Sequence, residues 1–128
     1  MLSRHLLLVA LGGALGSAAR FGLSGWALHH SVNWRFPIGT FLVNVIGCLS
    51  VGLLGGLVVK HDLLSADARV FLFTGIAGGF TTFSAFGLET FYLLRRGEGL
   101  MAGAYVSASV ICSLLVLWIG FTAVFTRH

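Results

Sequence analysis

Two long segments of the chain, residues 37–59 and 99–125, contain no charged side chain. A helix of about 20 predominantly apolar residues spans the hydrocarbon core of a bilayer, so each segment is long enough to cross it. Residues 5–28 and 69–93 are nearly as apolar, and 57% of the 128 residues are hydrophobic whereas 9% are charged. A water-soluble domain needs a more polar surface. We therefore predict an all-α membrane protein with four transmembrane helices, folded as a single domain over residues 1–128.

The few charged residues restrict both the partners and the orientation of the chain. The formal net charge is +4, but the basic residues are scattered and form no patch, so we expect contact with membrane lipid and not with nucleic acid. One face of the membrane would carry Arg4, Lys60, Arg69 and Arg127. The other would carry Arg35, Arg95 and Arg96, with Arg20 added if its side chain snorkels outward. Lys and Arg in excess normally mark the cytoplasmic face, and this near-equal count favours neither orientation.

Insertion in both orientations would make an antiparallel, dual-topology homodimer the natural assembly, with its two-fold axis in the membrane plane. Glycines spaced four apart support such an assembly, because small residues let helix backbones approach closely in lipid. These pairs are Gly12/Gly16, Gly52/Gly56 and Gly75/Gly79. The alternative is that the charges are too few for their count to be meaningful, and glycine pairs also arise by chance in a chain with 18 glycines.

The third apolar segment contains a sequence that weakens a helix near its middle, Gly78-Gly79 followed by Thr81-Thr82. Each glycine costs a helix roughly 1 kcal/mol relative to alanine. Lipid does not tolerate unpaired carbonyl groups, so a break must lie inside protein or beside a cavity. We predict that the third helix is broken here, and that two such breaks could meet on the dimer axis and coordinate a cation through their carbonyls. The alternative is a glycine kink that only eases packing.

Uncharged polar residues lie deep in two of the predicted helices. In the second helix Thr40 and Asn44 are one turn apart and share a face. In the fourth helix Tyr105, Ser109 and Ser113 form a stripe of hydroxyl groups. An amide in an apolar helix needs hydrogen-bond partners, and serine often bonds to its own helix. These residues therefore either join helices by hydrogen bonds or line a polar path.

Titratable groups, by contrast, are nearly missing from the predicted helices, and Glu89 is the only acid within one. A proton-coupled antiporter needs a titratable carboxylate at mid-depth. Amides and hydroxyls donate hydrogen bonds without changing charge, which suits passive movement of a small anion. A small multidrug-type antiporter is the alternative, but it needs a carboxylate in the first helix and residues 6–28 contain none. A third possibility is a helical subunit that scaffolds a larger complex.

Phe83 and Phe86 are three residues apart and therefore share a helix face. Packing in the core is the ordinary use of such a pair. An aromatic ring is positive at its edge, so an edge that faces a pore attracts an anion weakly. This attraction is small beside the cost of dehydrating a small halide, so it requires hydroxyl and amide donors nearby, for which Asn44, Ser109 and Ser113 are the candidates.

Three motifs, GGALGSAARF (12–21), GTFLVNVIG (39–47) and GGFTTFSAF (78–86), together resemble the Fluc/CrcB fluoride channels over essentially the whole chain. The resemblance implies a dual-topology homodimer with two antiparallel fluoride pores and a structural sodium ion at its centre. One departure is Ala85, where the family commonly has threonine, so a hydroxyl is missing at this position.

The resemblance also assigns roles to individual residues. The expected pore lining comprises Thr40, Asn44, Phe83, Ser84, Phe86, Tyr105, Ser109 and Ser113. Gly78 and Thr81 would offer backbone carbonyls to the sodium ion. Arg20 matches the basic vestibule position that draws anions toward the pore mouth, and Glu89 matches the family's acidic position after the rings.

We therefore expect a passive, fluoride-selective channel in the bacterial inner membrane that exports fluoride from the cytoplasm and lowers its toxicity. Such a protein needs no nucleotide and performs no covalent chemistry. The chain contains no ATP-binding motif and no nucleophile–base constellation that would suggest an enzyme.

Overall fold

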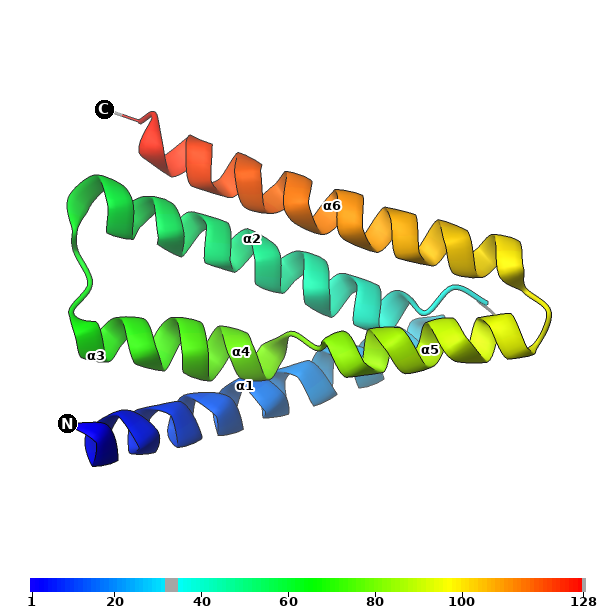
Figure 1. Ribbon diagram of the computed structural model, residues 1–128, viewed down its shortest axis with the longest axis horizontal. Helices are drawn as coiled ribbons and strands as arrows, with labels where there is room; N and C mark the ends of the chain where they lie inside the picture. The colour runs from blue at the N-terminus through cyan, green and yellow to red at the C-terminus, as the bar shows by residue number, and fades with distance from the viewer. Residues whose placement is uncertain (32–34, 128) are drawn as a thin grey trace.

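The computed structural model describes residues 1–31 and 35–127, and every regular element within them is a helix. The elements are α1 (Leu2–His30), α2 (Ile38–His61), α3 (Ala66–Arg69), η1 (Val70–Ala77), α4 (Gly78–Phe80), α5 (Phe83–Arg95) and α6 (Gly99–Phe125). The four elements from α3 to α5 follow one another in a single rod, interrupted between α4 and α5 (Figure 1). This rod is the third long helix. Its first half includes η1, a π-helical stretch that the sequence pattern does not reveal.

The structure confirms the prediction of four helices that are long and apolar enough to cross a membrane. They cover Leu2–His30, Ile38–His61, Ala66–Arg95 and Gly99–Phe125. Each matches one predicted segment. The first three extend a few residues further into the polar loops, where the end of a helix no longer depends on the apolar pattern.

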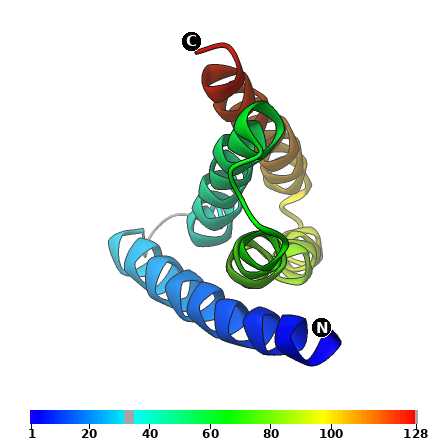
Figure 2. The ribbon, with the colours of Figure 1, turned by 90° about the vertical axis from the view of Figure 1, so that its left-hand side faces the viewer.

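The four rods pack as two pairs. α6 packs along α2, and α1 packs along η1 and α4. Viewed from its end, the molecule therefore has α1 on one side and α6 on the other, with α2 and the third helix between them (Figure 2). Both chain termini lie at the same end as the connection from α2 to α3 (Figure 1). The turn from α5 to α6 lies at the opposite end.

Polar contacts hold α1 to the start of the third helix. Asp67 accepts from Arg4 and from His5, with nitrogen–oxygen distances of 3.2 and 3.1 Å. The adjacent turn is closed by an ion pair of 2.5 Å between Arg69 and Asp62, whose φ of 49° ends α2 in the left-handed conformation. These polar contacts tie α1 and the end of α2 to the start of the third helix.

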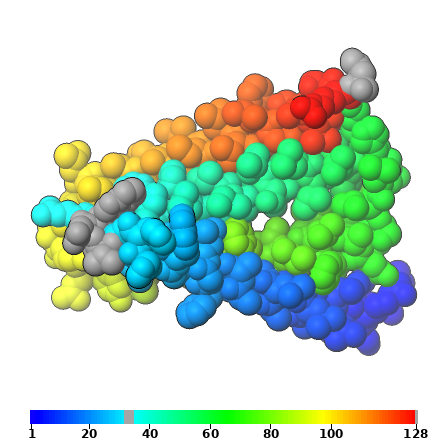
Figure 3. All heavy atoms as spheres, turned by 180° about the vertical axis from the view of Figure 1, so that it is seen from behind, coloured from blue at the N-terminus to red at the C-terminus, as the bar shows by residue number. Residues whose placement is uncertain are grey.

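Few side chains are buried within one copy of the chain. The fully buried large residues are Val43, Leu93 and Tyr105, whereas many leucines and aromatic residues are exposed. Exposed apolar surface suits a chain surrounded by lipid, because acyl chains are as apolar as leucine. A space-filling view also shows a narrow opening between α2 and the third helix that no other described element fills (Figure 3). The packing around the third helix is therefore incomplete in one copy.

Glycines set how closely α1 approaches the third helix. A Cβ atom placed on Gly12 would lie 2.7 Å from the Phe71 carbonyl oxygen, and one on Gly79 would lie 2.6 Å from the Gly13 carbonyl oxygen. A Cβ on Gly16 would overlap the carbonyl oxygen of Ile76. In each case the obstacle is backbone, which cannot rotate away. Two of the predicted small-residue pairs thus join helices within one copy.

Replacement of Gly16 by alanine should lower the free energy of unfolding by about 1–3 kcal/mol, because the added methyl group pushes α1 away from η1. Gly22 lies on the same helix, and a methyl group added there would meet no atom of the described residues within 4 Å. Gly22→Ala is therefore the matched control and should be neutral or slightly stabilising. The measurement is the fraction of detergent-solubilised protein that remains folded after heating. Equal thermal stability of the two variants would contradict this account of the contact.

Candidate functional site

The interruption of the third helix consists of Thr81 and Thr82. Both have extended backbones, with φ and ψ of −83° and 156° and of −149° and 120°, respectively. The predicted break is therefore present, but the glycines expected to cause it stay helical: Gly78 has φ −63° and ψ −38°. The reason is that Gly79 is needed for contact with α1, whereas the threonines have alternative hydrogen-bond partners. Thr82 caps the new helix, since its Oγ1 accepts from the Ala85 N–H at 3.2 Å.

Asn44 supplies the hydrogen bonds that the interruption removes from the backbone. Its Nδ2 donates to the Thr82 carbonyl at 3.0 Å, and its Oδ1 accepts from the Thr82 N–H at 2.9 Å. Both backbone groups of one extended residue are thus paired with one amide, whose orientation is fixed because the N–H can only donate. Asn44 was expected either to join helices or to line a polar path. Its amide joins α2 to the interruption of the third helix, and it also lies at the edge of a groove described below.

The Gly79 carbonyl is satisfied from the other side. In an unbroken helix it would accept from Phe83, which here starts a new helix. Instead it accepts from Arg20 Nε at 3.1 Å and from Ser17 Oγ at 3.5 Å, both on α1. The predicted vestibule residue Arg20 therefore lies against the end of α4. Because Asn44 acts from α2, the interruption is held between two neighbouring helices.

Aromatic rings follow the interruption in a short series. The ring centroids of Phe83 and Phe86 are 5.6 Å apart, and those of Phe86 and Tyr105 are 5.1 Å apart. Phe83 is 83% exposed in one copy, whereas Tyr105 is fully buried. The two phenylalanines share a face as predicted, and only one of them belongs to the packing around Tyr105. Ser84 is exposed, and its Oγ lies 3.3 Å from Thr82 Oγ1.

Glu89 joins the polar residues of three helices. Thr40 on α2 donates to Glu89 Oε1 at 2.8 Å, and Tyr105 on α6 donates to Glu89 Oε2, also at 2.8 Å. Sequence reasoning identified Glu89 as the only acid within a span but gave it no partners. The sequence did single out its two partners, because Thr40 and Tyr105 are both among the hydroxyl residues predicted to lie deep in the helices. Both of its oxygens are occupied by donors.

The remaining hydroxyls of the fourth helix face a groove, here called the central groove. It has a volume of about 390 Å³. Its polar and aromatic lining comprises Asn44, Thr81, Thr82, Phe83, Phe86, Ser109 and Ser113. Ser109 and Ser113 are 5% and 8% exposed, and Ser109 Oγ has no hydrogen-bond partner within the described part of the chain. A buried hydroxyl without a partner is uncommon in proteins and indicates a missing ligand, water or protein group.

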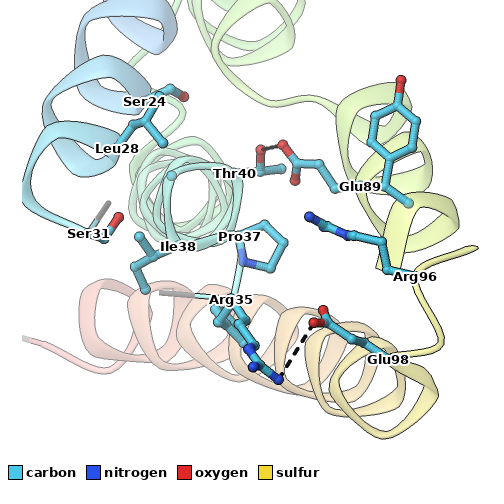
Figure 4. Close-up of a pocket in the computed structure, with 13 residues that line it drawn as sticks. Ser24, Leu28, Ser31, Arg35, Pro37, Ile38, Thr40, Glu89, Arg96 and Glu98 are labelled. Atoms are coloured by element: carbon cyan, nitrogen blue, oxygen red, sulfur yellow. Dashed lines mark hydrogen bonds and ion pairs between the residues drawn. The ribbon is translucent and has the colours of Figure 1, made fainter. Parts of the chain in front are cut away.

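A second cavity, here called the end hollow, lies at the end of the bundle where α5 turns into α6. Its volume is about 470 Å³, and its polar lining comprises Ser24, Ser31, Arg35, Thr40, Glu89, Tyr92, Arg96 and Glu98. Figure 4 shows Thr40 hydrogen-bonded to Glu89 on one side of the hollow and Arg35 facing Glu98 on another. Thr40 and Glu89 thus border the end hollow, and Tyr105 leads from them toward Phe86 and the central groove.

Residues 7–121 match the family described as "CrcB-like protein, Camphor Resistance (CrcB)". The chain belongs to the CrcB family. Among its relatives is the "Fluoride-specific ion channel FluC" of Methylobacillus flagellatus, 58% identical over 94% of each chain. Proteins of the same description from Hyphomonas neptunium and Rhizobium etli are 50% and 45% identical, each over 89% of this chain and 90% of the relative.

Membership of the CrcB family confirms the resemblance drawn from the three motifs. With the four apolar helices, it also identifies the chain as a multi-pass membrane protein. The relatives are described as ion channels, not as enzymes or antiporters, so the antiporter alternative is not favoured. Two motifs of the resemblance meet directly in the structure, since Asn44 of the second bonds Thr82 of the third.

Replacement of Asn44 by leucine should lower the free energy of unfolding by about 1–3 kcal/mol for each backbone group of Thr82 that loses its partner. Ser50→Ala is the control, because Ser50 is on the same helix and, among the described residues, its side chain bonds only the Ile46 carbonyl of that helix. Thermal stability in detergent provides the measurement. If Asn44→Leu is as stable as Ser50→Ala, the Asn44 amide does not stabilise the interruption.

Proposed function

We propose that the protein is a passive, fluoride-selective ion channel. The observation that carries this proposal is the continuous series of uncharged donors and rings between the two cavities. It starts with Thr40 and Tyr105, which both donate to the Glu89 carboxylate beside the end hollow, and continues through Phe86 to Ser109 and Ser113 in the central groove. The description of the relatives as fluoride-specific ion channels supports the same conclusion.

The chemistry of this series suits a small, strongly hydrated anion. Hydroxyl and amide groups replace water by donating hydrogen bonds, and the unpartnered hydroxyl of Ser109 is a donor not committed elsewhere among the described residues. At Glu89 an anion would compete for the protons of Thr40 and Tyr105, which the carboxylate already orients. A narrow path of this kind favours fluoride over chloride, because the larger ion does not fit the same donors.

The pore is completed, in this proposal, by a second copy in the opposite orientation. The central groove is open and Phe83 is almost fully exposed, so one copy leaves one side of the path unlined. The nearly equal numbers of basic residues at the two ends of the bundle allow both orientations. Two antiparallel copies would enclose two equivalent pores.

A structural sodium ion fits the interruption of the third helix. The Thr82 N–H, which would bond the Gly78 carbonyl in a continuous helix, donates to Asn44 instead. The carbonyl of the extended Thr81 also lies outside helical bonding. In an antiparallel dimer these carbonyls, from Gly78 and Thr81 of both copies, would form an oxygen cage around sodium and hold the two interruptions together.

In a bacterium such a channel would lie in the inner membrane and export fluoride from the cytoplasm, lowering its toxicity. Export requires no energy source when the internal concentration exceeds the external one. Hydrogen-bond donors line both cavities, and the carboxylates among their described lining residues, Glu89 and Glu98, both belong to the end hollow.

Purified protein in liposomes loaded with fluoride or chloride tests the proposal directly. We expect rapid fluoride efflux, measured with a fluoride electrode after the membrane potential is released by an ionophore, and little chloride efflux under the same conditions. Empty liposomes are the control. Equal efflux of both anions, or none of either, would refute fluoride selectivity.

Replacement of Phe83 or Phe86 by isoleucine should lower fluoride efflux at least tenfold while the protein keeps its elution volume on gel filtration, because the positive ring edges are lost without much change in volume. The control is Phe125→Ile, since the one described aromatic ring that Phe125 stacks on is Phe121, near the end of α6. Unchanged efflux in both ring variants would remove the rings from the path.

A further inference from the structure

The turn between α5 and α6 fixes two opposite charges at the end hollow. Gly97 has φ of 76°, and its N–H donates to the Leu94 carbonyl at 3.1 Å. The N–H of Glu98 donates to the Leu93 carbonyl at 2.8 Å. This pair of bonds is a Schellman motif, in which a glycine in the left-handed conformation ends the helix. Arg96 and Glu98 flank this glycine, so the backbone hydrogen bonds of the turn fix where both residues lie.

Glu98 already has a partner, whereas Arg96 has none among the described residues. Arg35 Nη1 lies 3.7 Å from Glu98 Oε1, so these two charges largely cancel beyond the hollow. No described carboxylate lies within 4.0 Å of Arg96. Figure 4 shows its side chain extending into the end hollow, on the side of Glu89. Of the two arginines that line the hollow, Arg35 and Arg96, Arg96 is therefore the one without a carboxylate partner among the described residues.

An anion that enters this cavity must approach Glu89, which repels it when ionised. A positive charge in the same cavity offsets that repulsion and raises the local concentration of anions. We propose that Arg96 is an anion-capture residue for the path that starts at Thr40 and Glu89. The inference rests on the proposed function, and its ligand is a small monovalent anion held loosely beside the guanidinium before it reaches the hydroxyls.

The position of Arg20 strengthens this assignment. The family resemblance assigned the attraction of anions to Arg20, but Arg20 Nε donates to the Gly79 carbonyl and Arg20 does not line the end hollow. Arg96 does line it, together with Thr40 and Glu89. Arg95, the preceding residue in the sequence, is exposed like Arg96 but lies outside this lining. The chain thus offers a matched pair of arginines, one inside the hollow and one outside it.

The test is the fluoride current across a planar bilayer at a fluoride concentration well below saturation, with a large impermeant anion such as gluconate adjusting the ionic strength. A unit charge about 8 Å from an anion in water changes its local concentration about two- to threefold at low ionic strength. We therefore expect Arg96→Gln to lower the current by about that factor at ~0.02 M salt and to approach wild type at ~0.5 M. Arg95→Gln removes the same charge from the same face and should leave the current close to wild type, and Arg96→Lys should retain most of it.

A charge change of the opposite sign separates electrostatic attraction from damage to the fold. Glu98→Gln leaves Arg35 without its partner, so the current at low ionic strength should rise above wild type. The inference is overturned if both arginine variants lose current equally, if the loss in Arg96→Gln persists at high ionic strength, or if Glu98→Gln also lowers the current at low ionic strength. A wild-type protein that carries no fluoride current would refute the proposed function itself, which is a different result.

Discussion

A backbone N–H or carbonyl group without a partner is costly in hydrocarbon, and this constraint determines where the third helix can be interrupted. The interruption at Thr81 and Thr82 is tolerated because Asn44 pairs both backbone groups of Thr82, and because Arg20 bonds the Gly79 carbonyl. One of these side chains comes from α2 and the other from α1. The non-helical residues therefore depend on two neighbouring helices, and everything that follows them, from Phe83 to Glu89, depends on their position.

The polar residues beyond the interruption form one connected unit. Glu89 orients the hydroxyls of Thr40 and Tyr105, and the ring of Tyr105 packs on Phe86. Donors from α2 and α6 thus converge on a short stretch of α5. Such convergence places donors in a low-dielectric environment, where each hydrogen bond to an anion is stronger than in water. The hydroxyl residues of this unit are buried within the bundle, whereas Phe83 is exposed at its surface.

The sequence predicted those features that depend on local composition. Long, predominantly apolar segments were enough to place four helices, and the polar residues Thr40, Asn44 and Tyr105 could be recognised because lipid excludes unpaired polar groups. The interruption was expected near the glycines but lies at the threonines, since a glycine pair marks low helix propensity and cannot show that Gly79 is held against α1. The partners of Glu89 and the carbonyl reached by Arg20 depend on contacts between distant segments, which no local pattern encodes. The roles of these residues in conduction, the antiparallel dimer and the sodium ion stay predictions.

Two adjacent glycines at the interruption meet different surroundings. A methyl group on Gly78 would lie 3.5 Å from the nearest atom, the Phe73 carbonyl oxygen, which is an ordinary contact, whereas one on Gly79 would collide with the backbone of Gly13. A cation cage built from carbonyls makes no demand on the side chain of the residue that supplies them. Substitutions should therefore be tolerated better at Gly78 than at Gly79, because the space between α1 and the third helix limits the side chain at Gly79.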